Sequence, residues 1–89
     1  MKTAGFELAP DNVRVNAVAP GAIDTPMLNG SMSRAEDPVA ARDYSRNRHA
    51  MKRFGQADEI ANGVVYLLSD EASFSTGSVI TIDGGWTAA

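Results

Sequence analysis

The stretch NAVAPGAIDTPM, residues 16–27, holds the features of this sequence best suited to bind a ligand. Pro20 and Gly21 end an apolar run, and Thr25 follows with a hydroxyl beside a second proline. The first proline fixes φ, and the glycine allows positive φ or a close approach of a ligand to the backbone. Backbone N–H groups freed beyond such a break can donate to an amide or a phosphate. The spacing alone leaves a second interpretation open, a plain strand-ending turn with a hydrogen bond to the threonine hydroxyl.

The two tyrosines and the single histidine are poor candidates for acid–base catalysis. Tyr44 is followed four residues later by Arg48 and lies in a polar segment that is expected to be exposed. Tyr66 is followed at the same spacing by Asp70, whose charge disfavours the ionised ring. His49, the only histidine, stands among basic residues and is expected to be solvated. We therefore expect no catalytic residue in this chain.

The composition narrows the classes of partner. The 89 residues include 8 basic and 11 acidic side chains, and a net charge of −3 disfavours nucleic acid and anionic membranes. There is no cysteine, and the carboxylates show no metal-ligand spacing with the histidine, so we expect no metal site. The longest apolar run, residues 64–68, is too short to cross a bilayer, and residues 1–10 lack a secretory signal. These features predict a cytoplasmic protein.

The elements that position the 16–27 stretch can be placed from the pattern of apolar residues. Residues 1–9 have the character of a helix end, and the β-branched segment 13–18 predicts a strand. Residues 28–53 are polar and arginine-rich, and we expect an exposed, mobile excursion with weak helical character. Apolar residues at helical spacing predict a helix over 56–69, and residues 79–82 predict a second strand.

Strand, excursion, helix and strand follow each other in the order of a parallel crossover unit. Ligands of open parallel sheets bind beyond the carboxyl ends of the strands, and Gly21 lies at such an end. Gly63, inside the predicted helix, is expected to allow a close approach of helix and sheet. Two strands alone leave bare edges, and one helix cannot cover both faces. We therefore expect further strands in protein outside these 89 residues.

Taken in order, the motifs of the chain resemble those of the short-chain dehydrogenase/reductase family. The matching blocks are NVRVNAVAPG (12–21), IDTP (23–26), RFG (53–55), EIA (59–61), SDEASFSTG (69–77) and IDGGW (82–86). The longest stretch outside them runs from about residue 28 to 52, and in this family that segment is the variable lid over the substrate. The resemblance implies an α/β fold, the carboxy-terminal part of a Rossmann-type doubly wound parallel sheet. Residues 1–89 would then be the carboxy-terminal portion of one domain, without its amino-terminal nucleotide-binding part.

The resemblance also implies a role for four residues in binding NAD or NADP. Pro20 and Gly21 match the turn beside the nicotinamide half of the cofactor. Ile23 matches the position whose backbone contacts the carboxamide, and Thr25 matches a hydroxyl near the carboxamide and the pyrophosphate. No role of this kind follows from composition or periodicity.

The activity implied by the resemblance is an NAD(P)-dependent oxidoreductase that acts on a small-molecule carbonyl or secondary alcohol. The glycine-rich phosphate loop and the tyrosine–lysine pair of the family do not occur in this sequence. The chain is therefore expected to supply the nicotinamide-side wall, the lid and an oligomer surface, and to be inactive alone. A homo-oligomer would use the 57–69 helix and the 79–82 strand. The alternative is a non-catalytic interaction or relic fragment that associates with itself or with a full-length homologue.

Overall fold

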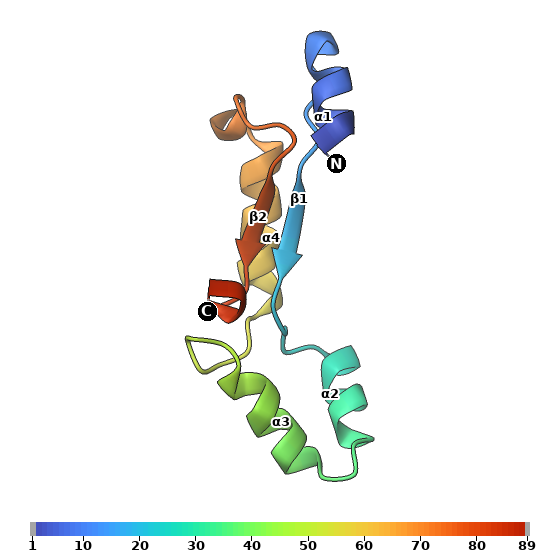
Figure 1. The fold of residues 1–89 in the computed structure, drawn as a ribbon, viewed down its shortest axis with the longest axis vertical. Coiled ribbons are helices and arrows are strands. Elements are labelled where there is room, and N and C mark those ends of the chain that lie inside the picture. The colour runs from blue at the N-terminus through green and yellow to red at the C-terminus, as the bar shows by residue number, and fades with distance from the viewer. Residues whose placement is uncertain (1, 89) are drawn as a thin grey trace.

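The computed structural model describes residues 2–88, an elongated molecule of 52 × 26 × 22 Å. Its helices and strands, in chain order, are α1 (Lys2–Leu8), β1 (Ala17–Pro20), α2 (Pro26–Ser33), α3 (Pro38–Asn47), α4 (Ala57–Leu68) and β2 (Val79–Ile82). Short 3₁₀ turns follow α1, α4 and β2. The two strands lie in the middle of the molecule, with α1 towards one end and the α2–α3 pair at the other (Figure 1).

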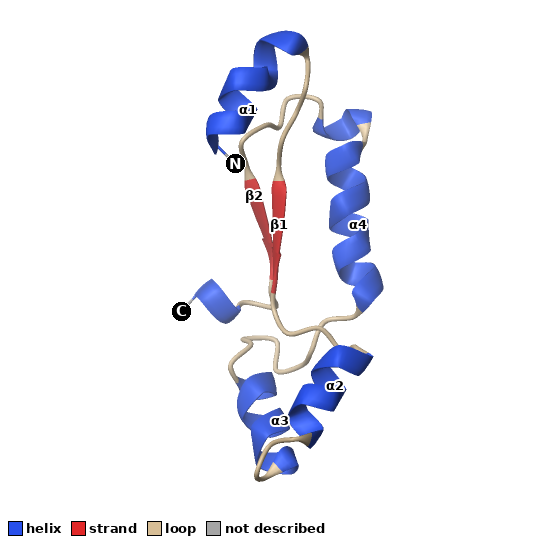
Figure 2. Ribbon diagram, turned by 90° about the vertical axis from the view of Figure 1, so that its right-hand side faces the viewer, coloured by secondary structure: helices blue, strands red, loops and turns tan. Residues whose placement is uncertain are grey.

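The two strands are parallel, and their register runs from Ala17 opposite Val79 to Pro20 opposite Ile82. Seen from the side, α4 runs along one face of this strand pair (Figure 2). Gly63 is the point of close contact, since a Cβ there would lie 2.3 Å from Ile82 Cδ1. The expected parallel crossover and the expected role of Gly63 are therefore confirmed.

The first strand begins later than its β-branched residues indicate. The sequence predicts a strand over 13–18, whereas β1 starts only at Ala17. Asn16 explains the difference, because its side chain donates to the Ser75 carbonyl at 2.9 Å and accepts from the Ser78 N–H at 3.0 Å. These side-chain hydrogen bonds replace the backbone ladder at Asn16. The extended residues before Ala17 are therefore held in place although they are not part of the strand.

The expected polar excursion contains two helices, both capped at their N-termini. Thr25 Oγ1 accepts a hydrogen bond from the Leu28 N–H at 3.2 Å and begins α2. Asp37 Oδ1 accepts from the Ala40 N–H at 3.2 Å and begins α3. A proline follows each cap, at the position where a missing N–H costs nothing. The weak helical character predicted for this segment therefore becomes two short helices.

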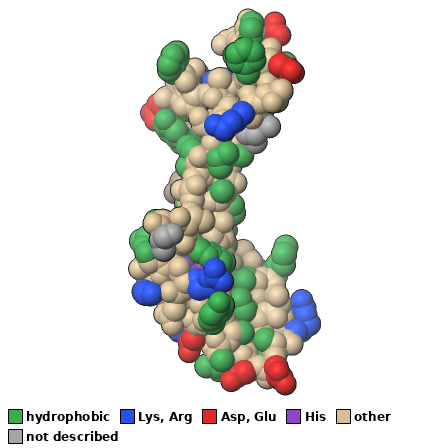
Figure 3. Space-filling view, viewed as in Figure 1, with side chains coloured by type: hydrophobic (Ala, Val, Ile, Leu, Met, Phe, Trp, Pro, Cys, Tyr) green, Lys and Arg blue, Asp and Glu red, His purple; other side chains and the backbone are tan. Residues whose placement is uncertain are grey.

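The apolar core of residues 2–88 is small. Its buried apolar residues are Phe54, Leu67 and Ala72. Other large apolar side chains are exposed, among them Leu68 at 78% and Phe74 at 103%. Figure 3 shows hydrophobic side chains on the surface, including the narrow middle of the molecule. None of the helices described within 2–88 is long and apolar enough to cross a membrane.

Candidate functional site

A pocket of about 120 Å³ lies beyond the carboxyl ends of the two strands. Residues 21–23, which follow β1, form part of its lining, and residues 82–84 at the end of β2 form another part. His49 and Gly55 complete the wall from the segment that leads into α4. The edge of a parallel sheet at which ligands bind is therefore the edge at which this pocket opens.

Gly21 allows three segments to meet at the end of β1. Its N–H continues the ladder and donates to the Ile82 carbonyl at 3.1 Å. A Cβ at this position would lie 2.9 Å from His49 Nε2 and 3.0 Å from Asp83 Cα. Positive φ occurs at other glycines and not here. The sequence predicted that the glycine lets a ligand approach the backbone closely. In the structure the groups that come close to Gly21 are His49 and Asp83 of the protein itself.

Ile23 presents both of its backbone polar groups on one edge of the chain. It forms an isolated parallel bridge with Gly55. In that bridge the Asp24 N–H donates to the Gly55 carbonyl at 2.8 Å, and the Gly55 N–H donates to the Ala22 carbonyl at 3.0 Å. The N–H and C=O of the central residue in such a bridge point the other way. Within residues 2–88 neither group has a hydrogen-bond partner, so a free donor and a free acceptor stand side by side.

Thr25 combines a structural bond with a free donor. Its Oγ1 accepts from the Leu28 N–H, which is the threonine hydrogen bond of the plain-turn interpretation. Accepting uses a lone pair of the oxygen, so the hydroxyl proton remains available to a ligand. Asn29 Nδ2 donates to Asp24 Oδ1 at 3.0 Å and steadies the same turn. The two interpretations of this residue are therefore compatible.

The expectation of a solvated His49 is wrong. Its side chain is 1% exposed. Nε2 accepts a hydrogen bond from the Ala22 N–H at 3.1 Å, and Nδ1 lies 2.9 Å from the Ser45 carbonyl. The ring packs edge-on against Phe54 and Trp86, with centroid distances of 6.2 and 4.9 Å. The neighbouring Arg48 and Lys52 are exposed, as expected for this segment, and no sequence signal identified a partner for the ring.

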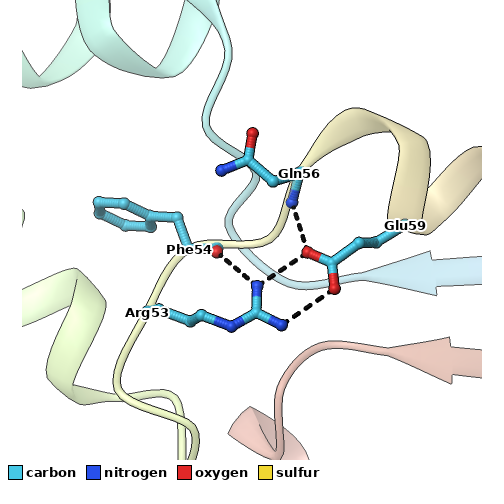
Figure 4. A network of polar contacts seen from close by, with 4 residues as sticks. All are labelled: Arg53, Phe54, Gln56 and Glu59. Atoms are coloured by element: carbon cyan, nitrogen blue, oxygen red, sulfur yellow. Dashed lines mark hydrogen bonds and ion pairs between the residues drawn. The ribbon is translucent and has the colours of Figure 1, made fainter.

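An ion pair orders the wall of the pocket at the start of α4 (Figure 4). The Arg53 guanidinium makes two bonds of 2.8 and 2.9 Å to the Glu59 carboxylate and a third of 3.1 Å to the Phe54 carbonyl. Glu59 also accepts from the Gln56 N–H at 2.9 Å, so its carboxylate satisfies a backbone donor at the start of α4. The hydrogen bond from Arg53, followed by that from Gln56, lowers the pKa of Glu59 to about 2.

Asp83 organises the turn after β2. Its carboxylate accepts from the Gly85 N–H at 2.9 Å and from the Thr87 hydroxyl and N–H at 2.7 and 3.1 Å. These bonds, that from the Thr87 hydroxyl first, lower the pKa of the carboxyl. Gly84 and Gly85 both have positive φ. The Asp83 carboxylate is thus occupied by hydrogen bonds from Gly85 and Thr87 in its own turn.

The other candidate residues lie away from the pocket. Neither Tyr44 nor Tyr66 is part of its lining. The Tyr44 hydroxyl accepts a hydrogen bond from Arg48 at 3.3 Å on the exposed side of α3. Over residues 2–88 there is no cluster of three histidine, aspartate or glutamate side chains that could hold a metal ion.

Comparison with known proteins identifies the family. A family model described as "Enoyl-(Acyl carrier protein) reductase" matches residues 1–87. A short chain dehydrogenase family protein from Francisella tularensis superposes with a TM-score of 0.91 at 34% identity, over 99% of this chain and 38% of that chain. The chain belongs to the short-chain dehydrogenase/reductase family. The predicted resemblance and the α/β fold of Rossmann type are therefore confirmed.

Three further proteins that are similar to this chain are longer than it. It is 48% identical, over 94% of its length and 32% of the relative's, to 3-oxoacyl-[acyl-carrier-protein] reductase FabG of Thermotoga maritima. The structure described as 4-hydroxyisoleucine dehydrogenase complexed with NADH has a TM-score of 0.85 at 34% identity, over 99% of this chain and 35% of that chain. ElxO with NADP bound has a TM-score of 0.84 at 33% identity, over 99% and 34%. The chain spans about a third of the length of the curated relatives it matches.

Proposed function

We propose that this chain forms the nicotinamide-side wall of an NAD(P)-dependent oxidoreductase that acts on a small-molecule carbonyl or secondary alcohol. Membership of the dehydrogenase/reductase family supports the reaction class, and the two relatives whose titles name NADH and NADP support the cofactor. The observation that carries the proposal is the free N–H and C=O of Ile23 at the carboxyl end of the sheet. A primary carboxamide offers the matching pair, one acceptor and one donor.

In this proposal four residues position the nicotinamide, which donates or accepts the hydride. The Ile23 N–H donates to the carboxamide oxygen, and the Ile23 carbonyl accepts from its NH₂ group. Two bonds of opposite sense fix which face of the ring meets the substrate. Thr25 donates its free hydroxyl proton to the carboxamide or the pyrophosphate. Pro20 and Gly21 end β1 so that this backbone is exposed at the edge of the sheet.

We also propose that residues 1–89 are the carboxy-terminal portion of a single Rossmann-type domain, with residues 28–52 as the lid over the substrate. The α2–α3 pair that occupies this segment stands beyond the carboxyl ends of the strands (Figure 1). The cytoplasm is the proposed location, since the sequence contains no cysteine that an oxidising compartment would pair.

The 89-residue chain by itself is proposed to have no dehydrogenase activity. Its sequence contains no tyrosine followed four residues later by lysine, and no glycine-rich loop between a strand and a helix. The test is the change in nicotinamide absorbance with the purified chain, NADH or NADPH and a panel of ketones and aldehydes. Turnover above a protein-free blank would overturn this part of the proposal.

Binding of the nicotinamide is tested separately, by amide NMR of the ¹⁵N-labelled chain. Nicotinamide mononucleotide should shift the Ile23 amide, whereas nicotinic acid mononucleotide should not, because its carboxylate repels the Ile23 carbonyl. The amide of Phe74, in the turn after α4, serves as the internal reference. Equal shifts with the two nucleotides, or none with either, would contradict the assignment of Ile23.

A second candidate function is association with another copy or with a full-length homologue. The observation that favours it is the exposed apolar surface of α4 and β2, where Val65 is 64%, Leu68 78% and Val79 53% exposed. We propose this surface for a homo-oligomer. Light scattering after size exclusion should show an oligomer that Val65→Asp converts to monomer, while Val39→Asp, on α3, leaves it unchanged. A wild-type monomer would remove this candidate.

A further inference from the structure

We propose that His49 is a positioning residue, which holds the Ala22–Ile23 backbone in the orientation that the nicotinamide carboxamide requires. The inference rests on the proposed function of Ile23 and goes beyond it, since it assigns the control of this backbone to a side chain in the lid segment. His49 is buried and both of its ring nitrogens are bonded to backbone groups, so it acts through the peptide that it holds.

The hydrogen bonds of His49 define which ring nitrogen donates and which accepts. Nε2 accepts from the Ala22 N–H, so this nitrogen carries a lone pair. The other ring nitrogen, Nδ1, faces the Ser45 carbonyl at 2.9 Å and must therefore donate. These two roles place a proton on Nδ1, and both ring nitrogens are used. Phe54 and Trp86 hold the plane of the ring from two sides.

Three backbone polar groups on either side of Ile23 are hydrogen-bonded within the protein. The Ala22 N–H is taken by His49, and the Ala22 carbonyl is taken by the Gly55 N–H. The Asp24 N–H is taken by the Gly55 carbonyl. The free pair on Ile23 thus remains between anchored neighbours, and His49 supplies the only one of these anchors that comes from a side chain within residues 2–88. Loss of its lone pair frees the peptide between Gly21 and Ala22 to rotate.

Two variants separate the hydrogen bond from the packing of the ring. His49→Gln keeps an oxygen that can accept from the Ala22 N–H, and His49→Phe keeps a ring without an acceptor. Amide hydrogen exchange of Ala22, measured without any ligand, should stay slow in wild type and His49→Gln and become about tenfold faster in His49→Phe, the loss expected for one hydrogen bond. Asn47→Ala, an exposed change at the last residue of α3 and two residues before His49, should leave exchange unchanged.

The link to the site is read from nicotinamide mononucleotide binding. The dissociation constant should rise about tenfold in His49→Phe, and less than about threefold in His49→Gln. Slow Ala22 exchange in a folded His49→Phe, or nucleotide binding by that variant as tight as by wild type, would overturn the proposal. If His49→Phe is unfolded, the exchange of Ala22 in wild type decides, because fast exchange there would show that no persistent bond to His49 holds this amide. If wild type binds no nucleotide the proposed function fails, while the exchange of Ala22 still tests the positioning role.

Discussion

The guanidinium of Arg14 donates to the carbonyl of Leu67 at 2.7 Å, across 53 residues of sequence. The same side chain reaches the carbonyls of Ala72 at 2.9 Å and Ser69 at 3.3 Å. The last carbonyls of a helix have no partner within it, and a cation there also meets the negative end of the helix dipole. Arg14, in the segment just before β1, thus caps the C-terminus of α4. Its hydrogen bonds link this helix to the chain that leads into the sheet.

Replacement of Arg14 by alanine should lower the free energy of unfolding by about 2 kcal/mol, the range of hydrogen bonds to charged groups. Arg14→Lys keeps the charge but loses the fork of donors, so we expect about half of that loss. Urea unfolding followed by circular dichroism measures both. Arg34→Ala, an exposed arginine with no side-chain hydrogen bond among residues 2–88, is the control. Equal stability of Arg14→Ala and Arg34→Ala would contradict the capping role.

Two glycines should respond to alanine with opposite signs. A Cβ on Gly5 would lie 2.6 Å from the N and 2.8 Å from the Cα of Gly77, both backbone atoms that cannot move alone. A Cβ on Gly30, within α2, would meet nothing nearer than the end of Arg34 at 3.6 Å. Gly5→Ala should therefore destabilise by about 1–3 kcal/mol and Gly30→Ala stabilise by up to about 1 kcal/mol. Thermal unfolding distinguishes the two, and a common sign would refute the argument.

The contact between Gly63 and Ile82 predicts a coupling between two substitutions. Gly63→Ala improves helix propensity but places its methyl group against Ile82 Cδ1, so we expect a net loss of about 1 kcal/mol. Ile82→Val removes that atom at a cost of about 1 kcal/mol. Because the methyl group of Gly63→Ala fits the space so vacated, the double variant should be more stable than the sum of the single losses predicts by about 1 kcal/mol. Additive losses in chemical denaturation would show that the helix and strand do not press on each other.

The sequence predicted the regular elements where the pattern of apolar residues is decisive. The helix expected over 56–69 is α4 (Ala57–Leu68), and the strand expected over 79–82 is β2. The first strand was misplaced because β-branched residues near Val13 favour extended backbone wherever they occur, whereas pairing decides which of them belong to the ladder. Pairing with β2 begins at Ala17, and the side chain of Asn16 fastens the residues before it.

The sequence predicted where the candidate site lies, but it did not predict which side chains form its wall. The motif around Pro20 and Gly21 placed a break at the carboxyl end of a strand, and the pocket lies there. His49 was missed because its burial results from three segments that meet only in the folded chain. Its partner Ala22 is 27 residues away, and the turn that carries Trp86 follows the other strand. The neighbours of His49 in the sequence, such as Arg48 and Lys52, are exposed, so nothing in the local sequence indicated that the histidine itself is buried.

The ion pair between Arg53 and Glu59 predicts a loss of stability in acid. The pKa of Glu59 lies near 2, below its ordinary value of 4.5, first because of the hydrogen bond from Arg53 and next because of that from the Gln56 N–H. A carboxyl whose pKa is lowered by folding stabilises the folded state above its ordinary pKa, and this contribution disappears as the pH falls from about 4.5 to about 2. Glu59→Gln should therefore flatten the dependence of stability on pH in this window, while Glu7→Gln, an exposed residue of α1, should not. Carboxyl-carbon NMR gives the pKa of Glu59 directly, and in Arg53→Gln it should return towards its ordinary value. An unshifted pKa in wild type would show that the pair does not persist in solution.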